Sequence, residues 1–229
     1  MNKKYYLALL LAVICLLPGC RMRRSVKTDD PPVMEEDTVA VFTPVFSSTP
    51  IPPAVAERMR GVSYPDNAEI QMESLRYLQL AYVDFDGMDQ VGELVCNKLI
   101  ADDLLAIFQA LYEARYPIRS IRLIDDFGAD DELSMEADNT SCFNYRPISG
   151  TSRLSRHAYG LAVDVNPFEN PYVRRSGVEP HGAEEYADRG RSFPHKIDRN
   201  DLCYKLFIEH GFRWGGTWNS VKDYQHFEK

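Results

Sequence analysis

The chain has 229 residues and a formal net charge of −8, and 45% of its residues are hydrophobic and 11% aromatic. This composition provides enough apolar surface for one good-sized folded domain and excludes disorder throughout the chain. The acidic balance, with no cluster of Lys and Arg beyond about the first thirty residues, argues against a nucleic-acid-binding protein.

The N-terminus has the pattern of an export signal. Lys3 and Lys4 precede an apolar run, residues 5–17, which is too short to span a bilayer comfortably. The run ends in Leu17-Pro18-Gly19-Cys20, which resembles a bacterial lipobox. We therefore expect residues 1–19 to be a lipoprotein signal peptide and Cys20 to carry the lipid. The alternative is an ordinary secretory signal with a chance cysteine. Both interpretations predict an extracytoplasmic protein, and the lipobox predicts one anchored to a bacterial membrane, on its periplasmic side.

Residues 20–55 are expected to form a flexible tether. They contain an acidic patch at residues 35–37 and six prolines among Ser and Thr, without a sustained period of strand or helix. The folded part is predicted to be a single domain that covers residues 56–229.

Three cysteines follow Cys20 in the chain: Cys96, Cys142 and Cys203. An odd number cannot pair completely within one chain, and their spacing does not resemble a zinc cluster. One disulfide is possible in an oxidising compartment, but the sequence does not select the pair. We expect all three to be mostly buried small residues.

Patterns of apolar residues predict the regular elements of the first half of the domain. In chain order these are 67–77 (helix), 78–85 (strand), 92–99 (strand), 102–116 (helix, stopped by Pro117) and 118–124 (strand).

The second half contains two polar stretches, residues 125–145 and 170–200, which are expected to be loops, the first of them over a site. A helix is expected over residues 201–210, with Gly211 as its cap. Its inward-facing residues are expected to be Leu202, Leu206 and Phe207. Helices and strands are grouped rather than strictly alternating, which favours an α+β fold with an antiparallel sheet flanked by helices.

The central pattern of the chain is Ser155-x-His157-x-x-Gly160-x-Ala162-x-Asp164. In the alternating run 161–165, the apolar side chains would line one strand face and leave Asp164 on the other. Gly160 can adopt backbone angles closed to other residues, so the chain can bend there and bring His157 beside Asp164. A nitrogen and an oxygen ligand would then share a small site.

A second pattern, Asp223-x-x-His226, lies near the C-terminus. His226 would complete a set of three zinc ligands with His157 and Asp164, and three protein ligands leave one position open for water. Asp223 is placed to take a proton from that water. Each of these residues alone would more often be structural, and it is their conjunction that indicates a catalytic zinc site.

These motifs resemble those of the zinc D-Ala-D-Ala carboxypeptidase and L-Ala-D-Glu endopeptidase family, peptidase family M15. The resemblance extends to Gly211-Phe212-x-Trp214-Gly215-Gly216-x-Trp218, followed by Asp223-Tyr224-x-His226-Phe227-Glu228, and to Asn139-Thr140-Ser141-x-Phe143-Asn144-x-Arg146. It covers roughly residues 65–229. It implies a hedgehog/D-Ala-D-Ala peptidase-like fold with one zinc ion per chain. It also implies that His157, Asp164 and His226 bind the zinc and that Asp223 is the catalytic acid and base.

The family also has a basic residue upstream of the zinc motif that polarises the scissile carbonyl or stabilises the oxyanion. Arg146 matches this role best, although Arg153 and Arg156 are close by in the sequence. The alternative for Arg146 is a structural ion pair with Asp125 or Asp126.

Aromatic residues near the motifs could line a substrate cleft or belong to the core. Tyr159, Trp214 and Trp218 are candidates for substrate binding, whereas the core is favoured for Phe143. Ser155 is expected at the substrate site, where it would orient the turn or a ligand rather than act as a nucleophile. We assign no metal-binding role to the other histidines: His181, His195 and His210.

The resemblance implies hydrolysis of a peptide bond in peptidoglycan stem peptides by a zinc-activated water, with Asp223 as the base. The sequence does not select among D,D-carboxypeptidase, D,D-dipeptidase and L,D-endopeptidase activities. Two other functions stay open: a zinc peptidase acting on free D-amino-acid peptides, and a non-catalytic zinc-stabilised module that binds the cell wall or a partner protein.

Overall fold

A computed structural model describes residues 41–229 of the chain. The predicted signal peptide, Cys20 and most of the predicted tether lie outside the described residues. Within residues 41–229, no helix combines the length and apolarity needed to cross a membrane.

The first sheet has three antiparallel strands in the order β1-β2-β3. These are β1 (Phe46–Thr49), β2 (Leu75–Val83) and β3 (Asp89–Asn97). In β1, Phe46 lies opposite Leu80 and Thr49 lies opposite Tyr77. The expectation that the tether extends to residue 55 is therefore wrong, because residues 46–49 are already part of this sheet. This short segment is ordered because it pairs with β2, and its own composition does not predict that pairing.

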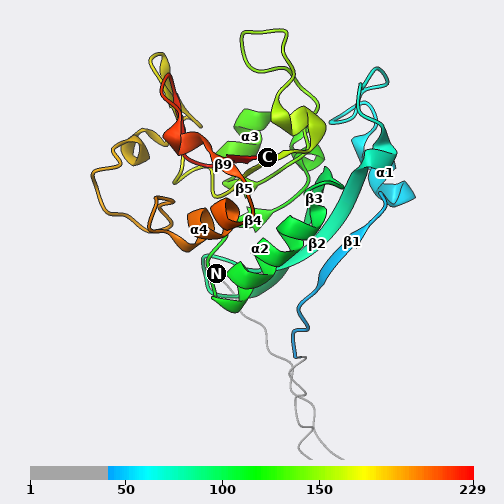
Figure 1. Cartoon of the computed structure of the whole chain (residues 1–229), viewed down its shortest axis with the longest axis horizontal. Coiled ribbons are helices and arrows are strands. Elements are labelled where there is room, and N and C mark those ends of the chain that lie inside the picture. The colour runs from blue at the N-terminus through cyan, green and yellow to red at the C-terminus, as the bar shows by residue number, and fades with distance from the viewer. Residues whose placement is uncertain (1–40) are drawn as a thin grey trace, which may run out of the picture. The chain divides into compact units, whose positions relative to one another are not determined.

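Helix α2 (Ala101–Glu113) packs against β1 and β2 (Figure 1). Its buried residues include Leu104, Ile107, Phe108 and Leu111, at the three- and four-residue spacing of one helix face. The predicted helix over 102–116 and the two strands that precede it are thus confirmed, with shifts of a few residues at their ends. The predicted helix over 67–77 is wrong, because only Met72–Ser74 forms a 3-10 turn and β2 begins at Leu75.

Short elements make up the rest of the described chain. The helical ones are α1 (Pro53–Met59), η1 (Met72–Ser74), η2 (Ile124–Phe127), α3 (Asp131–Glu136), η3 (Arg156–Tyr159), η4 (Glu184–Ala187), α4 (Leu202–Glu209) and η5 (Gly215–Thr217). The strands are β4 (Ser120–Ile121), β5 (Asn139–Thr140), β6 (Ala162–Asp164), β7 (Tyr172–Arg174), β8 (Gly177–Glu179), β9 (Arg213–Trp214), β10 (Lys222–Asp223) and β11 (His226–Glu228).

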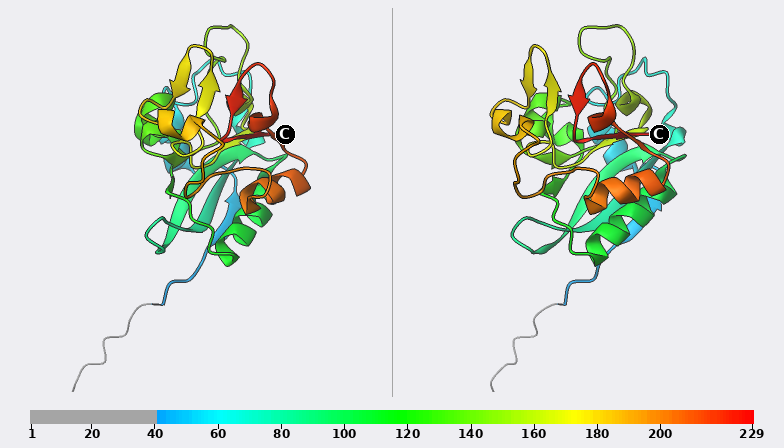
Figure 2. Two further views of the ribbon diagram at one scale, coloured as in Figure 1. Left: turned by 90° about the vertical axis from the view of Figure 1, so that its left-hand side faces the viewer. Right: turned by 60° about the vertical axis from the view of Figure 1, so that its left-hand side comes forward.

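Three predicted segments differ from the observed ones. The strand expected over 118–124 is reduced to β4, which pairs in parallel with β5. The loop expected over 125–145 contains α3 and β5. The loop expected over 170–200 contains the β7–β8 hairpin, to which β10 adds a third strand (Figure 2). These elements are too short to leave a clear periodic pattern in the sequence.

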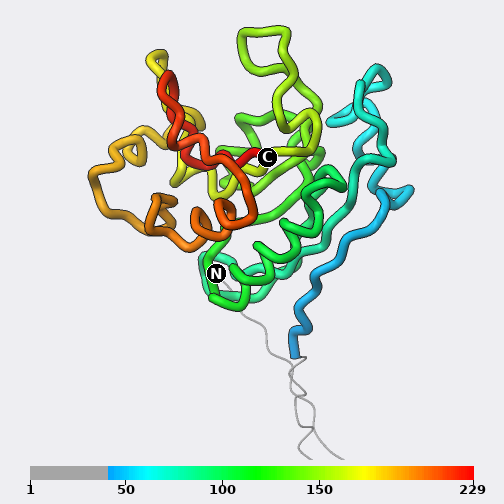
Figure 3. Tube along the Cα trace, viewed as in Figure 1, coloured from blue at the N-terminus to red at the C-terminus, as the bar shows by residue number. Residues whose placement is uncertain are grey.

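The C-terminal segment returns to the middle of the domain, where β11 lies between β6 and β9 (Figure 3). Phe227 of β11 is fully buried and stacks on Phe207 of α4, with ring centroids 4.2 Å apart. Helix α4 was predicted correctly, and Gly211 follows it with a φ of 81°. One inward residue was wrong: Leu202 is 37% exposed, and Cys203 is buried instead.

The predicted α+β class with antiparallel sheets and flanking helices is confirmed. All three cysteines outside the N-terminal region, Cys96, Cys142 and Cys203, are free and buried, as expected for small core residues. The main core lies among the first sheet, α2 and α4, and includes the apolar sides of β6 and β11. Because one side of β6 and β11 is packed in the core, the backbone that carries the side chains on their opposite side is fixed in position.

Candidate metal centre and active site

Two paired strands place Asp164 and His226 next to each other. Strand β6 runs antiparallel to β11, and Asp164 lies directly opposite His226 in the register. Because side chains alternate along a strand, Val163 and Phe227 enter the core while Asp164 and His226 point to the other face. This is the alternation that the sequence predicts for Asp164.

His157 comes from the 3-10 turn η3, which immediately precedes β6. Ser155 caps this turn by accepting a hydrogen bond from the backbone N–H of His157 at 3.3 Å. Gly160 ends the turn with a φ of 65°. A Cβ atom at Gly160 would lie only 2.7 Å from the backbone nitrogen of Asn97 in β3. The predicted bend at Gly160 is confirmed, and the close approach gives a second reason for glycine there.

The ligand atoms of His157, Asp164 and His226 converge within 4.8 Å of one another. Nε2 of His157 lies 3.1 Å from Oδ2 of Asp164 and 3.2 Å from Nδ1 of His226. Nδ1 of His226 lies 3.0 Å from Oδ1 of Asp164. Two imidazole nitrogens and a carboxylate are typical of a catalytic zinc centre, so the donor set fits this metal.

The environment of His157 fixes which ring nitrogen faces the site. Its Nδ1 lies 2.6 Å from the carbonyl oxygen of Cys142. A carbonyl can only accept, so Nδ1 carries the proton and donates it, and Nε2 presents its lone pair to Asp164 and His226. Such a second hydrogen bond is the usual support of a metal-binding histidine.

The electrostatics of the cluster favour a cation. Burial alone would raise the pKa of Asp164, but the imidazoles of His157 and His226 hold it well below its usual range. Burial lowers the pKa of His226, whereas Asp164 and Glu228 raise it, and the balance is a pKa of about 10. The carboxylates around His226 therefore stabilise positive charge at this position, as they would for a bound metal ion.

Asp223 lies beside the cluster on β10, where it pairs with Tyr172 of β7. Its Oδ1 is buried and has no hydrogen-bond partner among residues 41–229. Burial raises the pKa of Asp223 to about 7, with a smaller contribution from the charge of Asp164. A carboxyl group with a pKa near neutrality can both accept and return a proton at physiological pH.

These residues line one cleft, with a volume of about 890 Å³. The cleft carries side chains of both charges. The acidic ones, apart from Asp164 and Asp223, are Asp130, Asp131, Glu132, Glu179 and Glu228. The basic ones, apart from the histidines, are Arg146, Arg153, Arg156 and Arg213. The basic side chains of the cleft could pair with the carboxylate groups of a polar peptide, and its acidic side chains with the amino groups.

Residues 149–229 match the family model of D-alanyl-D-alanine carboxypeptidase. This C-terminal part of the chain is therefore similar to peptidase family M15. The matched region contains His157, Asp164, Asp223 and His226. No curated protein and no solved structure gives a match to the chain.

Arg146 lies outside the region that matches the M15 family, but the structure places it in the same cleft. It pairs with Asp131 of α3. Neither of the predicted alternative partners is used: Asp125 accepts from the backbone of Ser63, and Asp126 pairs with Arg58 and Arg122. The positive charge of Arg146 lowers the pKa of Asp223, so the two residues are electrostatically linked.

Only part of the predicted substrate-binding set lies in this cleft. Ser155 and Trp218 line it, and the Trp218 ring centroid is 5.1 Å from that of His226. Trp214 is instead 5% exposed in the core, where its indole N–H donates to the carbonyl of Tyr224 at 2.8 Å. Placing Trp214 in the substrate site is therefore wrong. Phe143 is buried, as predicted.

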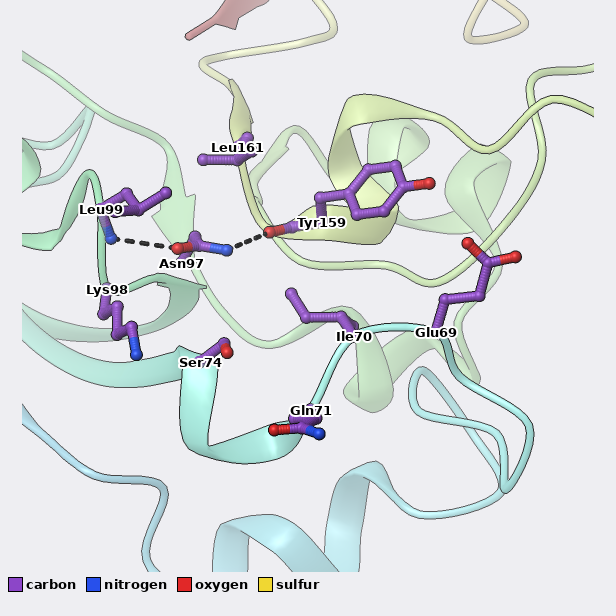
Figure 4. A pocket seen from close by; sticks show the side chains of 9 residues that line it. All are labelled: Glu69, Ile70, Gln71, Ser74, Asn97, Lys98, Leu99, Tyr159 and Leu161. Carbon is purple, nitrogen blue, oxygen red and sulfur yellow. Dashed lines mark hydrogen bonds between the residues drawn. The ribbon is translucent and has the colours of Figure 1, made fainter.

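Tyr159 lines a different pocket, of about 400 Å³ (Figure 4). Its carbonyl accepts a hydrogen bond from the side-chain amide of Asn97 at 2.9 Å. The 3-10 turn η3 explains this placement, because a step of two residues along such a tight turn directs the side chains of His157 and Tyr159 to different sides. Tyr159 is therefore not a residue of the cleft that holds the candidate metal site.

The remaining histidines lie elsewhere in the fold. His210 is 3.1 Å from Asp103, and His195 stacks on Phe85 with centroids 3.7 Å apart. His181 is exposed and lies 3.6 Å from Glu184.

Gly215 and Glu228 belong to the C-terminal motif, but the sequence alone assigns neither of them a role. A Cβ atom at Gly215 would lie 2.6 Å from the carbonyl oxygen of Asp223, so glycine allows η5 to pack against β10. Glu228 contacts His226 on the same face of β11. The two-residue spacing of a strand was the available signal for Glu228, but it required β11 to be recognised as a strand.

Proposed function

We propose that this protein is a zinc-dependent peptidase that hydrolyses peptide bonds in peptidoglycan stem peptides. The observation that carries the proposal is the convergence of three donor atoms, from His157, Asp164 and His226, beside Asp223, whose buried Oδ1 has no hydrogen-bond partner among the described residues. The family match supports a peptidase with this kind of substrate.

The ligands in this proposal are Nε2 of His157, a carboxylate oxygen of Asp164 and Nδ1 of His226. When bound there, zinc would polarise the scissile carbonyl and lower the pKa of a water molecule. Asp223 would accept the proton of the attacking water and return it to the leaving amine, which its raised pKa suits. Arg146 would favour the negative charge that develops on the carbonyl oxygen.

The surroundings of the site support catalysis over a purely structural role. A structural zinc is normally closed by four protein ligands, whereas within residues 41–229 three suitable residues meet here. A non-catalytic module would also have no use for a buried carboxylate with a pKa near 7 beside the ligands. The lipid anchor at Cys20, which is inferred from the sequence, would hold such an enzyme at the membrane, within reach of the cell wall.

The test is mass spectrometry of muropeptides digested by wild-type protein and by Asp223→Asn, each with and without a chelator. Loss of a base of this kind is expected to lower turnover by about 10²- to 10⁴-fold while zinc content stays at one ion per chain. Asp66→Asn is the matched control, because Asp66 is exposed and lies outside the cleft. Full activity of Asp223→Asn would refute the proposed mechanism.

The same digest identifies the bond that is cut. Loss of a single terminal D-Ala would indicate a D,D-carboxypeptidase, and release of a dipeptide would indicate a D,D-dipeptidase. Cleavage after L-Ala would indicate an L,D-endopeptidase. Activity on free D-amino-acid dipeptides, with none on muropeptides, would contradict the proposed substrate but leave the chemistry in place.

A further inference from the structure

Glu228 lies on the same face of β11 as the ligand His226. The residue between them, Phe227, is fully buried in the core, so the alternation of the strand directs His226 and Glu228 to the opposite side. The neighbouring strands supply a partner for each. Asp164 of β6 lies opposite His226, and Arg213 of β9 lies opposite Glu228.

The two ring nitrogens of His226 face different carboxylates. Nδ1 lies 3.0 Å from Asp164 and 3.2 Å from Nε2 of His157, so this atom points into the candidate metal site. Nε2 lies 3.5 Å from Oε2 of Glu228. The other oxygen of Glu228, Oε1, accepts a hydrogen bond from Arg213 at 2.8 Å. The Glu228 side chain is only 13% exposed, so few other orientations are open to it.

We propose that Glu228 is a positioning residue for the metal ligand His226. Its carboxylate accepts the Nε2–H of the imidazole, so Nδ1 is the nitrogen that gives up its proton and binds the metal. The proposal rests on the zinc site put forward above. The physical reason is that an imidazole binds metal only through a deprotonated nitrogen, and the hydrogen bond of the other nitrogen decides which one that is.

The two ligand histidines are then supported in complementary ways. The carbonyl of Cys142 holds the proton of His157 on Nδ1, so His157 presents Nε2. Glu228 holds the proton of His226 on Nε2, so His226 presents Nδ1. A carboxylate partner also makes the imidazole a stronger donor to the metal than a neutral partner does.

Two other roles for Glu228 must be separated from this one. The carboxylate could serve only to anchor Arg213, whose side chain is 74% exposed. It could also bind an amino group of the substrate, since it lines the cleft. Neither role predicts a change in the affinity of the protein for zinc.

The experiment compares zinc affinity, by competition with a chromophoric chelator, in the full chain and in three variants: Glu228→Ala, Glu228→Gln and Arg213→Met. Glu228→Ala is expected to bind zinc about 10- to 100-fold more weakly, the usual cost of losing such a partner. Glu228→Gln is expected to lose less, because its amide oxygen still accepts the Nε2–H. Arg213→Met keeps the carboxylate and should stay within about threefold of wild type.

Thermal unfolding of the metal-free variants shows whether each is folded, and only folded variants are compared. A Glu228→Ala affinity equal to that of wild type would overturn the positioning role. An equal loss in Arg213→Met and Glu228→Ala would overturn it as well, because the ion pair alone would then be responsible. If the wild-type chain itself bound no zinc, the proposed function and this inference would both fail. If the wild-type chain bound zinc and Glu228→Ala bound it equally well, the inference alone would fail.

Discussion

Replacing Gly215 by alanine tests whether the close packing of η5 against β10 positions the proposed base. A Cβ atom at this position would lie 2.6 Å from the carbonyl oxygen of Asp223, 2.7 Å from its Cβ and 3.3 Å from the Cβ of His226. All three contacts involve backbone or Cβ atoms that no side-chain rotation can move. The strand that carries the base must therefore shift as a whole.

The size of the shift follows from these contacts. Moving the carbonyl of Asp223 from 2.6 Å to an ordinary contact of 3.4 Å requires a displacement of roughly 0.8 Å. A misplacement of about 1 Å at a catalytic group can cost about 10²-fold in rate. We therefore expect Gly215→Ala to lower kcat by about 100-fold, with a loss of about 1–3 kcal/mol in the free energy of unfolding from overpacking.

The assay is the rate of muropeptide cleavage at saturating zinc, together with urea unfolding. Gly190→Ala is the matched control, because a Cβ there meets only the mobile end of the Asp188 side chain at 3.2 Å. The control should keep wild-type activity. If Gly215→Ala is folded and cleaves muropeptides at the wild-type rate, Gly215 does not position Asp223 and the steric reasoning is wrong.

Two further predictions concern stability. Gly160→Ala should lower the free energy of unfolding by about 2–4 kcal/mol, because residue 160 has a left-handed φ of 65° and its new Cβ would lie 2.7 Å from a backbone nitrogen of β3. The control is Gly150→Ala. Residue 150 has a φ of 75° but open space around it, so urea unfolding should show a loss of only about 1–2 kcal/mol. Burial and the neighbouring Asp138 raise the pKa of Glu169 to about 8, so the folded state holds a proton that the unfolded state releases above about pH 4.5. Stability should therefore fall as the pH rises from about 4.5 to 8, by about 1–2 kcal/mol for this partly exposed group, and Glu169→Gln should remove that part of the pH dependence. An identical pH dependence in Glu169→Gln would contradict the assignment.

The sequence predicted best those features whose cause is local. Helix α2 follows from the spacing of its apolar residues, and the bend at Gly160 follows from the conformational freedom of glycine. It predicted poorly the segments that gain order from distant partners. Strand β1 was taken for tether because four residues among prolines show no pattern until they pair with β2. Likewise, Tyr159 and Trp214 are aromatic residues near the motifs, but packing directs them away from the cleft.

The sequence by itself determined the chemistry that is available. Two histidines and two aspartates in two short motifs supply the donors for a metal and a base, because ligand type and spacing are properties of the chain. Only the tertiary structure decided how these groups meet. The pairing of β11 with β6 sets His226 opposite Asp164, and its pairing with β9 joins Glu228 to Arg213. The physical reason is that a strand fixes only the side to which a residue points, whereas its neighbours in the sheet fix what that residue touches.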